Sequence, residues 1–189
     1  DGWSPRLAEI IRMAIWALKI VPEQGIQADL ATVKGLVEEK EYFKALYLLE
    51  IMPENIESAA LKYQCKLEVS ENSAIRYFDV IQEKYRGDEQ YPAVMESIMH
   101  LVLVSDSRTD AVIKNGLDAA ERLLRSGRNG DYRVHETMGV LCYRYGESFK
   151  RKGVQALENS IPAAKMNRVG DDVIKHLEEQ VKIYREKLD

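Results

Sequence analysis

The sequence contains few residues that interrupt helices, and it has no hydrophobic run long enough to cross a bilayer. Among its 189 residues are 11 glycines and 5 prolines, too few for the many tight turns of an all-β fold. A membrane-spanning helix needs roughly 20 consecutive apolar residues, and no stretch approaches that length. The net charge of −4 is too small to favour nucleic acid or lipid as a partner. These absences favour a helical protein without a membrane span.

Cysteine is also scarce. Cys65 and Cys142 both lie in apolar, helix-like segments, where a free thiol usually acts as a small hydrophobe. We therefore expect both side chains to be buried and reduced. No Asn-x-Ser/Thr acceptor site occurs, and the sequence favours a cytoplasmic or nuclear location. Because the chain opens on Asp1 without an initiator methionine, we expect a processed chain or a fragment.

Residues that could carry out chemistry are scattered along the chain. The histidines, His100, His135 and His176, lie far apart, and none has a cysteine or second histidine at the spacing of a zinc site. The segment HETMG begins like a zinc-protease helix but lacks the second histidine four residues on. The glycines of SGRNGD do not follow a strand, so they do not form a phosphate-binding loop. We expect no enzymatic activity, no metal and no cofactor.

The sequence does carry helical periodicity along most of its length. Tyr42, Ala45 and Leu49 recur at spacings of three and four, and Pro53 stands where that helix should end. Comparable patterns predict about ten helices joined by short turns. The expected helices span residues 4–21, 28–39, 41–52, 56–69, 73–85, 90–104, 111–127, 132–151, 153–168 and 171–187.

No stretch shows the sustained alternation of a β-strand, so the sequence predicts an all-α fold built from antiparallel helical hairpins. The first helix should begin with Ser4 as its N-cap and Pro5 at its first position. Within the segment 153–168, Pro162 indicates either one kinked helix or two short helices.

Three segments share an arrangement of small and aromatic residues. LVEEKEYFKALYLLEIMPEN has Tyr42, the small residue Ala45, and Pro53 after its second helix. In VLCYRYGESFKRKGVQALENSIPAA, the corresponding residues are Leu141, Tyr143, Gly146, Ala156 and Ala163. The third segment, LKYQCKLEVSENSAIRYFDVI, has Ala74 at the place of Ala45. Together these segments resemble the tetratricopeptide repeat (TPR) family, in which two helices form a repeat of about 34 residues.

The resemblance implies a TPR-like α-solenoid, in which stacked hairpins form a superhelix. It covers residues 26–166 of a single domain spanning 1–189, with an N-terminal helix in 1–25 and a capping helix in 167–189. The implied function is that of a non-catalytic interaction module, scaffold or adaptor that binds a peptide or helix of a partner protein.

In the TPR family, the inward positions of the first helices carry the ligand contacts. The resemblance places these positions at Lys34, Tyr63, Lys66, His100, Tyr145 and Phe149. Tyr63 has an alternative role as a core residue. Two other functions also fit the sequence: a structural segment of a larger multiprotein complex, and a regulatory domain that senses a peptide.

Two basic clusters lie in the second half of the chain. They consist of Arg122, Arg125, Arg128 and Arg133, and of Arg144, Lys150, Arg151 and Lys152. Such cations either lie near helix C-termini, where the helix dipole favours them, or meet an acidic partner or nucleic acid. The interspersed acidic residues and the absence of an aromatic platform argue against nucleic acid.

The last predicted helix carries apolar residues at spacings of three and four, which is a heptad pattern. These residues are Ile174, Leu177, Val181, Tyr184 and Leu188. The pattern predicts either packing on the preceding hairpin as a cap or docking on another chain, including self-association.

Overall fold

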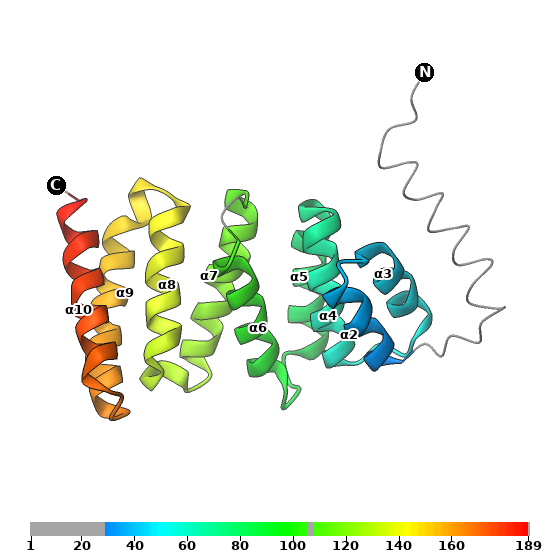
Figure 1. The fold of residues 1–189 in the computed structure, drawn as a ribbon, viewed down its shortest axis with the longest axis horizontal. Helices are drawn as coiled ribbons and strands as arrows, with labels where there is room; N and C mark the ends of the chain where they lie inside the picture. Colours follow the sequence, from blue (N-terminus) through cyan, green and yellow to red (C-terminus); the bar gives the residue numbers. More distant parts are fainter. Residues whose placement is uncertain (1–28, 106–107, 189) are drawn as a thin grey trace, which may run out of the picture. The chain divides into compact units, whose positions relative to one another are not determined.

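The computed structural model describes residues 29–105 and 108–188, and every regular segment within these ranges is a helix (Figure 1). The predicted all-α class is confirmed. The chain divides into two compact units, one from Asp1 to Lys84 and one from Tyr85 to Asp189. The helix predicted at residues 4–21 lies outside the described residues.

The first unit contains four described helices. They are α2 (Leu30–Glu38), α3 (Tyr42–Ile51), α4 (Ile56–Val69) and α5 (Glu71–Tyr85), whose last residue falls beyond the unit boundary. Consecutive helices α2, α3 and α4 pack against one another, and α4 contacts α5 through the rings of Tyr63 and Phe78.

Local side-chain hydrogen bonds explain where two of these helices begin. The Asp29 carboxylate accepts a hydrogen bond from the Thr32 backbone N–H at 2.7 Å, so it caps α2. Asn55 and Ser58 form a reciprocal capping box at the start of α4, with bonds of 2.8 and 2.9 Å. Between α2 and α3 the chain turns at Lys40, whose φ is 60°.

The core of the first unit forms where α2, α3 and α4 meet. Its buried members are Val33, Ala45, Leu48, Leu49 and Cys65. Ala45 and Ala74 are both 0 % exposed, in agreement with their assignment as packing residues. The stripe that begins at Tyr42 therefore faces neighbouring helices.

Replacing Ala45 with leucine should destabilise the protein by about 1–3 kcal/mol, because the larger side chain has no free volume around it. Ala31→Leu is the matched control, since Ala31 is exposed on α2 and its replacement should change stability by no more than about 0.5 kcal/mol. Urea unfolding of the two variants measures the difference. Equal stability of the two variants would contradict the packing of α3 described above.

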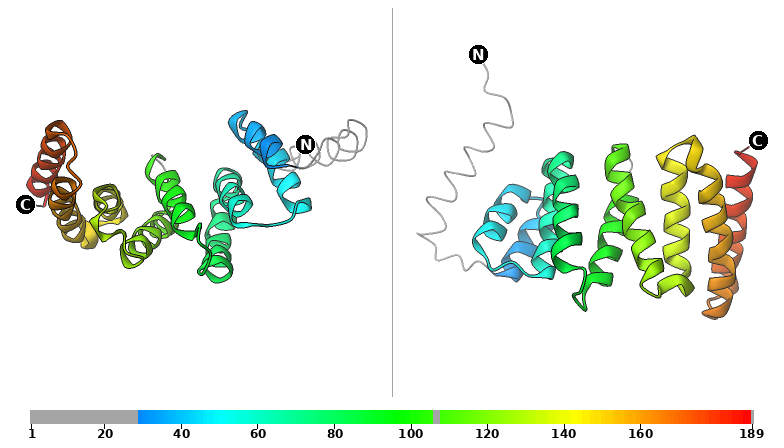
Figure 2. Two further views of the ribbon diagram at one scale, coloured as in Figure 1. Left: turned by 90° about the horizontal axis from the view of Figure 1, so that it is seen from below. Right: turned by 180° about the vertical axis from the view of Figure 1, so that it is seen from behind.

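The second unit contains five described α-helices and a short 3₁₀ turn. They are α6 (Tyr91–Leu103), α7 (Asp110–Arg125), η1 (Arg128–Gly130), α8 (Tyr132–Tyr145), α9 (Glu147–Met166) and α10 (Asp171–Glu186). Each α-helix packs against the next, and α6 also contacts α8. Figures 1 and 2 show α8, α9 and α10 side by side, with the chain direction reversing from one helix to the next.

Two predicted helix boundaries in this unit are wrong. The helix expected at 132–151 is divided at Gly146, whose φ of 147° and ψ of 170° lie outside the helical region and favour glycine. Gly146 is therefore a turn residue, although the repeat resemblance places it midway along a helix. The second half, 147–166, is one continuous helix through both Gly153 and Pro162, so the single-helix interpretation of this region holds.

Gly139 and Gly153 lie where α8 and α9 approach each other most tightly. A Cβ atom on Gly153 would lie 2.7 Å from the carbonyl oxygen of Gly139, and one on Gly139 would lie 2.9 Å from the carbonyl oxygen of Gly153. Real side chains do not tolerate such distances from a backbone oxygen. The two helices therefore pack with their backbones almost in contact, which requires glycine on both sides.

Candidate functional site

A groove of about 470 Å³ lies in the first unit along the junction of α4 and α5. It is lined by Leu46, Lys66, Val69, Ser70, Ser73, Arg76, Tyr77 and Val80. These residues come from α3, from the C-terminal half of α4, from the turn, and from the first two-thirds of α5. We refer to this feature as the α4–α5 groove.

The groove exists because a single residue, Ser70, joins α4 to α5. The Ser70 backbone N–H donates to the carbonyl of Lys66 at 2.7 Å and so completes the last turn of α4. The carbonyl of Ser70 accepts from the N–H groups of Ser73 and Ala74 at 2.9 and 3.1 Å, which starts α5. This connection places the end of α4 beside the beginning of α5.

Tyr77 is a fixed part of the groove wall. Only 9 % of this residue is exposed, and its hydroxyl donates a hydrogen bond to Oε1 of Glu54. The other oxygen of Glu54 accepts from Lys84 Nζ at 2.9 Å. The hydrogen bond from Tyr77, together with Lys84, holds the pKa of Glu54 below its usual value. Both oxygens of Glu54 are therefore occupied in orienting the wall.

The electrostatics of the groove are set by cations near Tyr77. Lys62 and Lys66 each place Nζ 5.4 Å from the centroid of the Tyr77 ring, within the range of a cation–π contact. Lys62 also pairs with Glu50 at 2.9 Å. Among the residues that the structure describes, Lys66 and Arg76 have no carboxylate at ion-pair distance; Arg76 Nε donates only to the carbonyl of Asn72, at 3.4 Å.

Of the three site residues predicted in the first unit, Lys66 lines the groove and the other two do not. Lys34 is exposed and pairs with Glu57 at 2.7 Å. Tyr63 is 0 % exposed, and its ring lies 6.2 Å from that of Phe78. Tyr63 is therefore a core residue and presents no surface to a partner, which corrects its assignment as a contact residue.

The three site residues predicted in the second unit do not share a helix. His100 is exposed in the last turn of α6. Tyr145 ends α8 and Phe149 lies in the first turn of α9, whereas both were expected on one helix. Their half-buried rings nonetheless contact each other edge to face, with centroids 4.6 Å apart across the turn at Gly146.

Sequence reasoning missed the contribution of α5 to the groove. Ser73, Arg76, Tyr77 and Val80 recur at spacings of three and four, so they lie on one face of that helix. Val80 is 43 % exposed although it is apolar. The sequence does contain this pattern, because the apolar Val80 follows Ser73, Arg76 and Tyr77 on the same face of the predicted helix.

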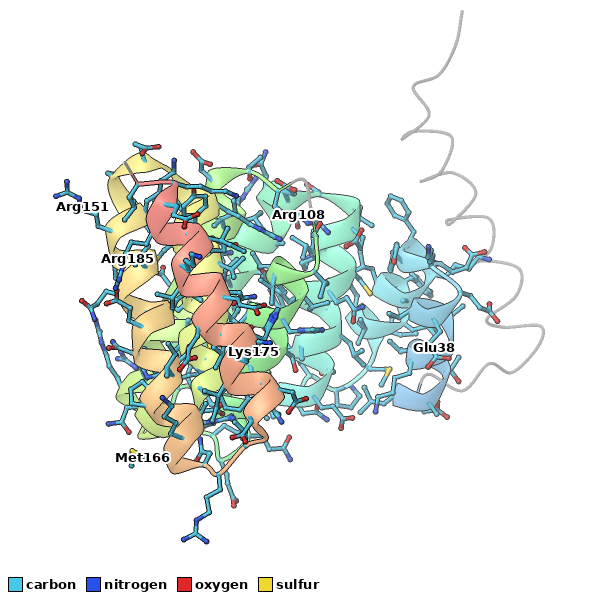
Figure 3. All side chains as sticks on the ribbon, turned by 60° about the vertical axis from the view of Figure 1, so that its left-hand side comes forward. Glu38, Arg108, Arg151, Met166, Lys175 and Arg185 are labelled. Atoms are coloured by element: carbon cyan, nitrogen blue, oxygen red, sulfur yellow. The ribbon has the colours of Figure 1, made fainter. Side chains whose placement is uncertain are left out.

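The basic clusters of the second unit are largely engaged within it. Arg144 donates to the carbonyl of Leu103 at 2.7 Å, so it caps the C-terminus of α6 as the dipole argument predicts. Lys152 pairs with Glu121 at 2.6 Å. Arg151, by contrast, is exposed and projects outward from α9 (Figure 3).

The heptad residues of α10 face the rest of the second unit. Leu177 and Val181 are buried, and Ile174 and Leu188 are half-buried. The ring of Tyr184 lies edge to face on Tyr143 of α8, with centroids 4.5 Å apart. The helix therefore packs as a cap on α8 and α9, and its heptad residues are already occupied by contacts within the chain.

Both cysteines are free and buried, as predicted. Burial raises the pKa of the Cys65 thiol to about 12 and also raises the pKa of Cys142. We expect Ellman's reagent to leave both thiols unmodified in the folded chain at about pH 8, and to label both after unfolding in urea. Rapid labelling of the folded chain would contradict this burial.

The raised pKa of Cys65 makes the stability of the folded chain depend on pH. Burial favours the neutral thiol, so the contribution of Cys65 to the free energy of unfolding is complete below pH 9.0 and is lost as the pH rises toward 12.

Within residues 29–105 and 108–188, no group of three or more His, Cys, Asp or Glu side chains could hold a metal ion. In the same part of the chain, no helix is both long and apolar enough to cross a membrane. No protein-family model matches the sequence, and comparison with curated proteins and with solved structures found no match either.

Proposed function

We propose that this chain is a non-catalytic protein-interaction module that holds a segment of a partner protein in the α4–α5 groove. The observation that carries the proposal is the composition of the groove. Its wall is fixed by Tyr77 and Glu54, while the neighbouring side chains of Lys66, Arg76 and Val80 remain available to a ligand. A fixed surface that combines apolar and charged groups is typical of peptide recognition.

The proposal includes a TPR-like solenoid arrangement of the helical hairpins. It is supported by the packing of consecutive helices within each unit, from α2 to α4 in the first and from α6 to α10 in the second, and by the contact of α6 with α8. It is also supported by the burial of Ala45, Ala74 and Ala156, the small residues on which the repeat resemblance rests. Stacked hairpins present extended surfaces, which suit binding of peptides and helices.

The proposal is tested by comparing two substitutions of exposed valines in the full-length chain. Val80 lines the groove and is 43 % exposed, whereas Val104 is 59 % exposed and lies in the second unit, outside the groove. Val80→Glu should abolish recovery of the binding partner from cell extract, because a charge replaces an apolar contact. Val104→Glu should recover the partner as the unchanged chain does. Both variants should have the melting temperature of the unchanged chain.

Two outcomes would contradict binding of the partner in the α4–α5 groove. If Val80→Glu recovers the same partner as the unchanged chain, binding uses a different surface. Stoichiometric recovery of a large complex by both variants would instead support a structural segment of that complex, held by broad helix packing.

A further inference from the structure

Among the described residues of the first unit, most Lys and Arg side chains pair with a carboxylate, including Lys44 with Glu41 at 3.0 Å. Lys34 pairs with Glu57 at 2.7 Å, Lys62 with Glu50 at 2.9 Å, and Lys84 with Glu54 at 2.9 Å. These pairs join different segments of the unit, and they leave Lys66 and Arg76 as the two groove cations without an acidic partner among the described residues. In a chain of net charge −4, two such cations in one groove mark a local reversal of sign.

Glu54 is hydrogen-bonded to Tyr77 in the groove wall, and it does not pair with Lys66 or Arg76. One of its oxygens accepts from Tyr77 and the other from Lys84. Among the described residues, no other carboxylate lies at ion-pair distance from Lys66 or Arg76, so both cations can pair with a carboxylate of a bound molecule. Because Arg76 is exposed and Lys66 is half-buried, ion pairs with these two residues should weaken with added salt.

The remaining lining of the groove defines the rest of the ligand. Leu46, Val69 and Val80 offer aliphatic contacts, and the hydroxyls of Ser70 and Ser73 can each donate a hydrogen bond to a carbonyl or carboxylate oxygen. A polypeptide supplies all three kinds of group at short spacing. A nucleic acid supplies anions but no aliphatic side chains for the three apolar residues.

From this charge complementarity we infer that the occupant of the α4–α5 groove is an acidic peptide segment. Its Asp or Glu side chains pair with Lys66 and Arg76, and a neighbouring aliphatic side chain packs on Val80 and Leu46. The inference rests on the proposed function and specifies the chemistry of the partner. It distinguishes this groove from the basic clusters of the second unit, where Arg144 and Lys152 are engaged within the chain.

The probe for the test is a displayed library of random 12-residue peptides, selected on the immobilised full-length chain. Peptides rich in Asp and Glu that also carry Leu, Ile or Val should be enriched. An enriched peptide is then synthesised with a fluorescent label, together with the same sequence carrying Asn and Gln in place of Asp and Glu. Fluorescence anisotropy should show binding of the acidic peptide that weakens by about tenfold or more in the neutralised peptide, and that weakens with added salt.

Charge reversal on the protein provides the matched control. Arg76→Glu should weaken binding of the acidic peptide by about tenfold or more, because a negative charge then faces the carboxylates of the peptide. Arg151→Glu makes the same change of net charge at an exposed position of α9 and should change the affinity by less than about twofold. Arg76 is exposed, so its reversal should leave the melting temperature unchanged, and the test does not depend on substituting the half-buried Lys66.

The outcomes separate failure of this inference from failure of the proposed function. Enrichment of peptides that require Val80 but carry no acidic residues would overturn the inference and leave the proposed function standing. Binding of a poly(dT) oligonucleotide that competes with the acidic peptide and is lost in Arg76→Glu would also overturn it, in favour of a nucleic-acid polyanion. If no peptide binds the groove in any selection, both the inference and the proposed function fail.

Discussion

Replacing Gly153 with leucine should destabilise the second unit by about 3 kcal/mol or more, and Gly153→Ala by about 1–3 kcal/mol. The reason is the close approach of α8 and α9, where a Cβ on Gly153 would lie 2.7 Å from the carbonyl oxygen of Gly139. A rotamer change cannot relieve a clash with a backbone atom, so the helices must separate and lose the packing between them. Thermal and urea unfolding, followed by circular dichroism, measure the effect.

Gly130→Ala is the matched control for Gly153→Ala. Gly130 belongs to the same unit, and a Cβ built on it meets nothing within 4 Å. This substitution should change the stability by no more than about 0.5 kcal/mol. If Gly153→Ala were instead more stable than the unchanged chain, as helix propensity alone predicts for alanine in a helix, the close crossing of α8 and α9 would be wrong.

Replacing Tyr63 with alanine should destabilise the first unit by about 3–5 kcal/mol, the usual cost of truncating a large buried aromatic side chain. Tyr63 is 0 % exposed and packs on Phe78 of α5, so its removal leaves a cavity between α4 and α5. Tyr63→Phe keeps the ring and its contact with Phe78, so it should lose far less stability than Tyr63→Ala. Urea unfolding of both variants gives the comparison.

The same pair of variants separates a core role for Tyr63 from a contact role. If Tyr63→Ala kept the stability of the unchanged chain and lost only its partner, Tyr63 would be a contact residue after all. In the structure, Phe78 follows Tyr77 directly on α5, so loss of the Tyr63 ring should also disturb the groove wall. Affinity and stability should therefore fall together.

Helical periodicity predicted the spans of the helices well wherever a helix has one buried face and ends at a clear signal. The span of α4 was predicted as 56–69 and is found as Ile56–Val69, because Asn55 and Ser58 cap its start. The small residues that the three repeat-like segments share, Ala45, Ala74 and Ala156, are all buried. In each case the information is local, within one or two helical turns.

The wrong predictions concern positions where two helices meet, because the apolar periodicity of one helix does not show where its neighbour lies. The apolar pattern continues through Gly146, and only the backbone conformation of that residue shows that the chain turns there. Gly153 was taken as the start of a helix, although its role is to let α9 approach Gly139 on α8. Tyr63 and Lys66 are three residues apart on α4, yet one is buried and the other lines the groove. The direction of a partner helix decides such differences, and a single helix does not encode it.

The one-residue connection at Ser70 makes the α4–α5 groove sensitive to changes in chain length. Ser70 is extended, with φ of −162° and ψ of 104°, and it both completes the last turn of α4 through its N–H and starts α5 through its carbonyl. One residue inserted at this connection would divide these two roles between two residues and shift the start of α5 relative to the end of α4. Such a shift would move Arg76 and Val80 relative to Lys66. Substitutions can therefore change the lining of the groove residue by residue, whereas insertions at Ser70 would dismantle it, and variation in length has to be accommodated in other connections of the chain.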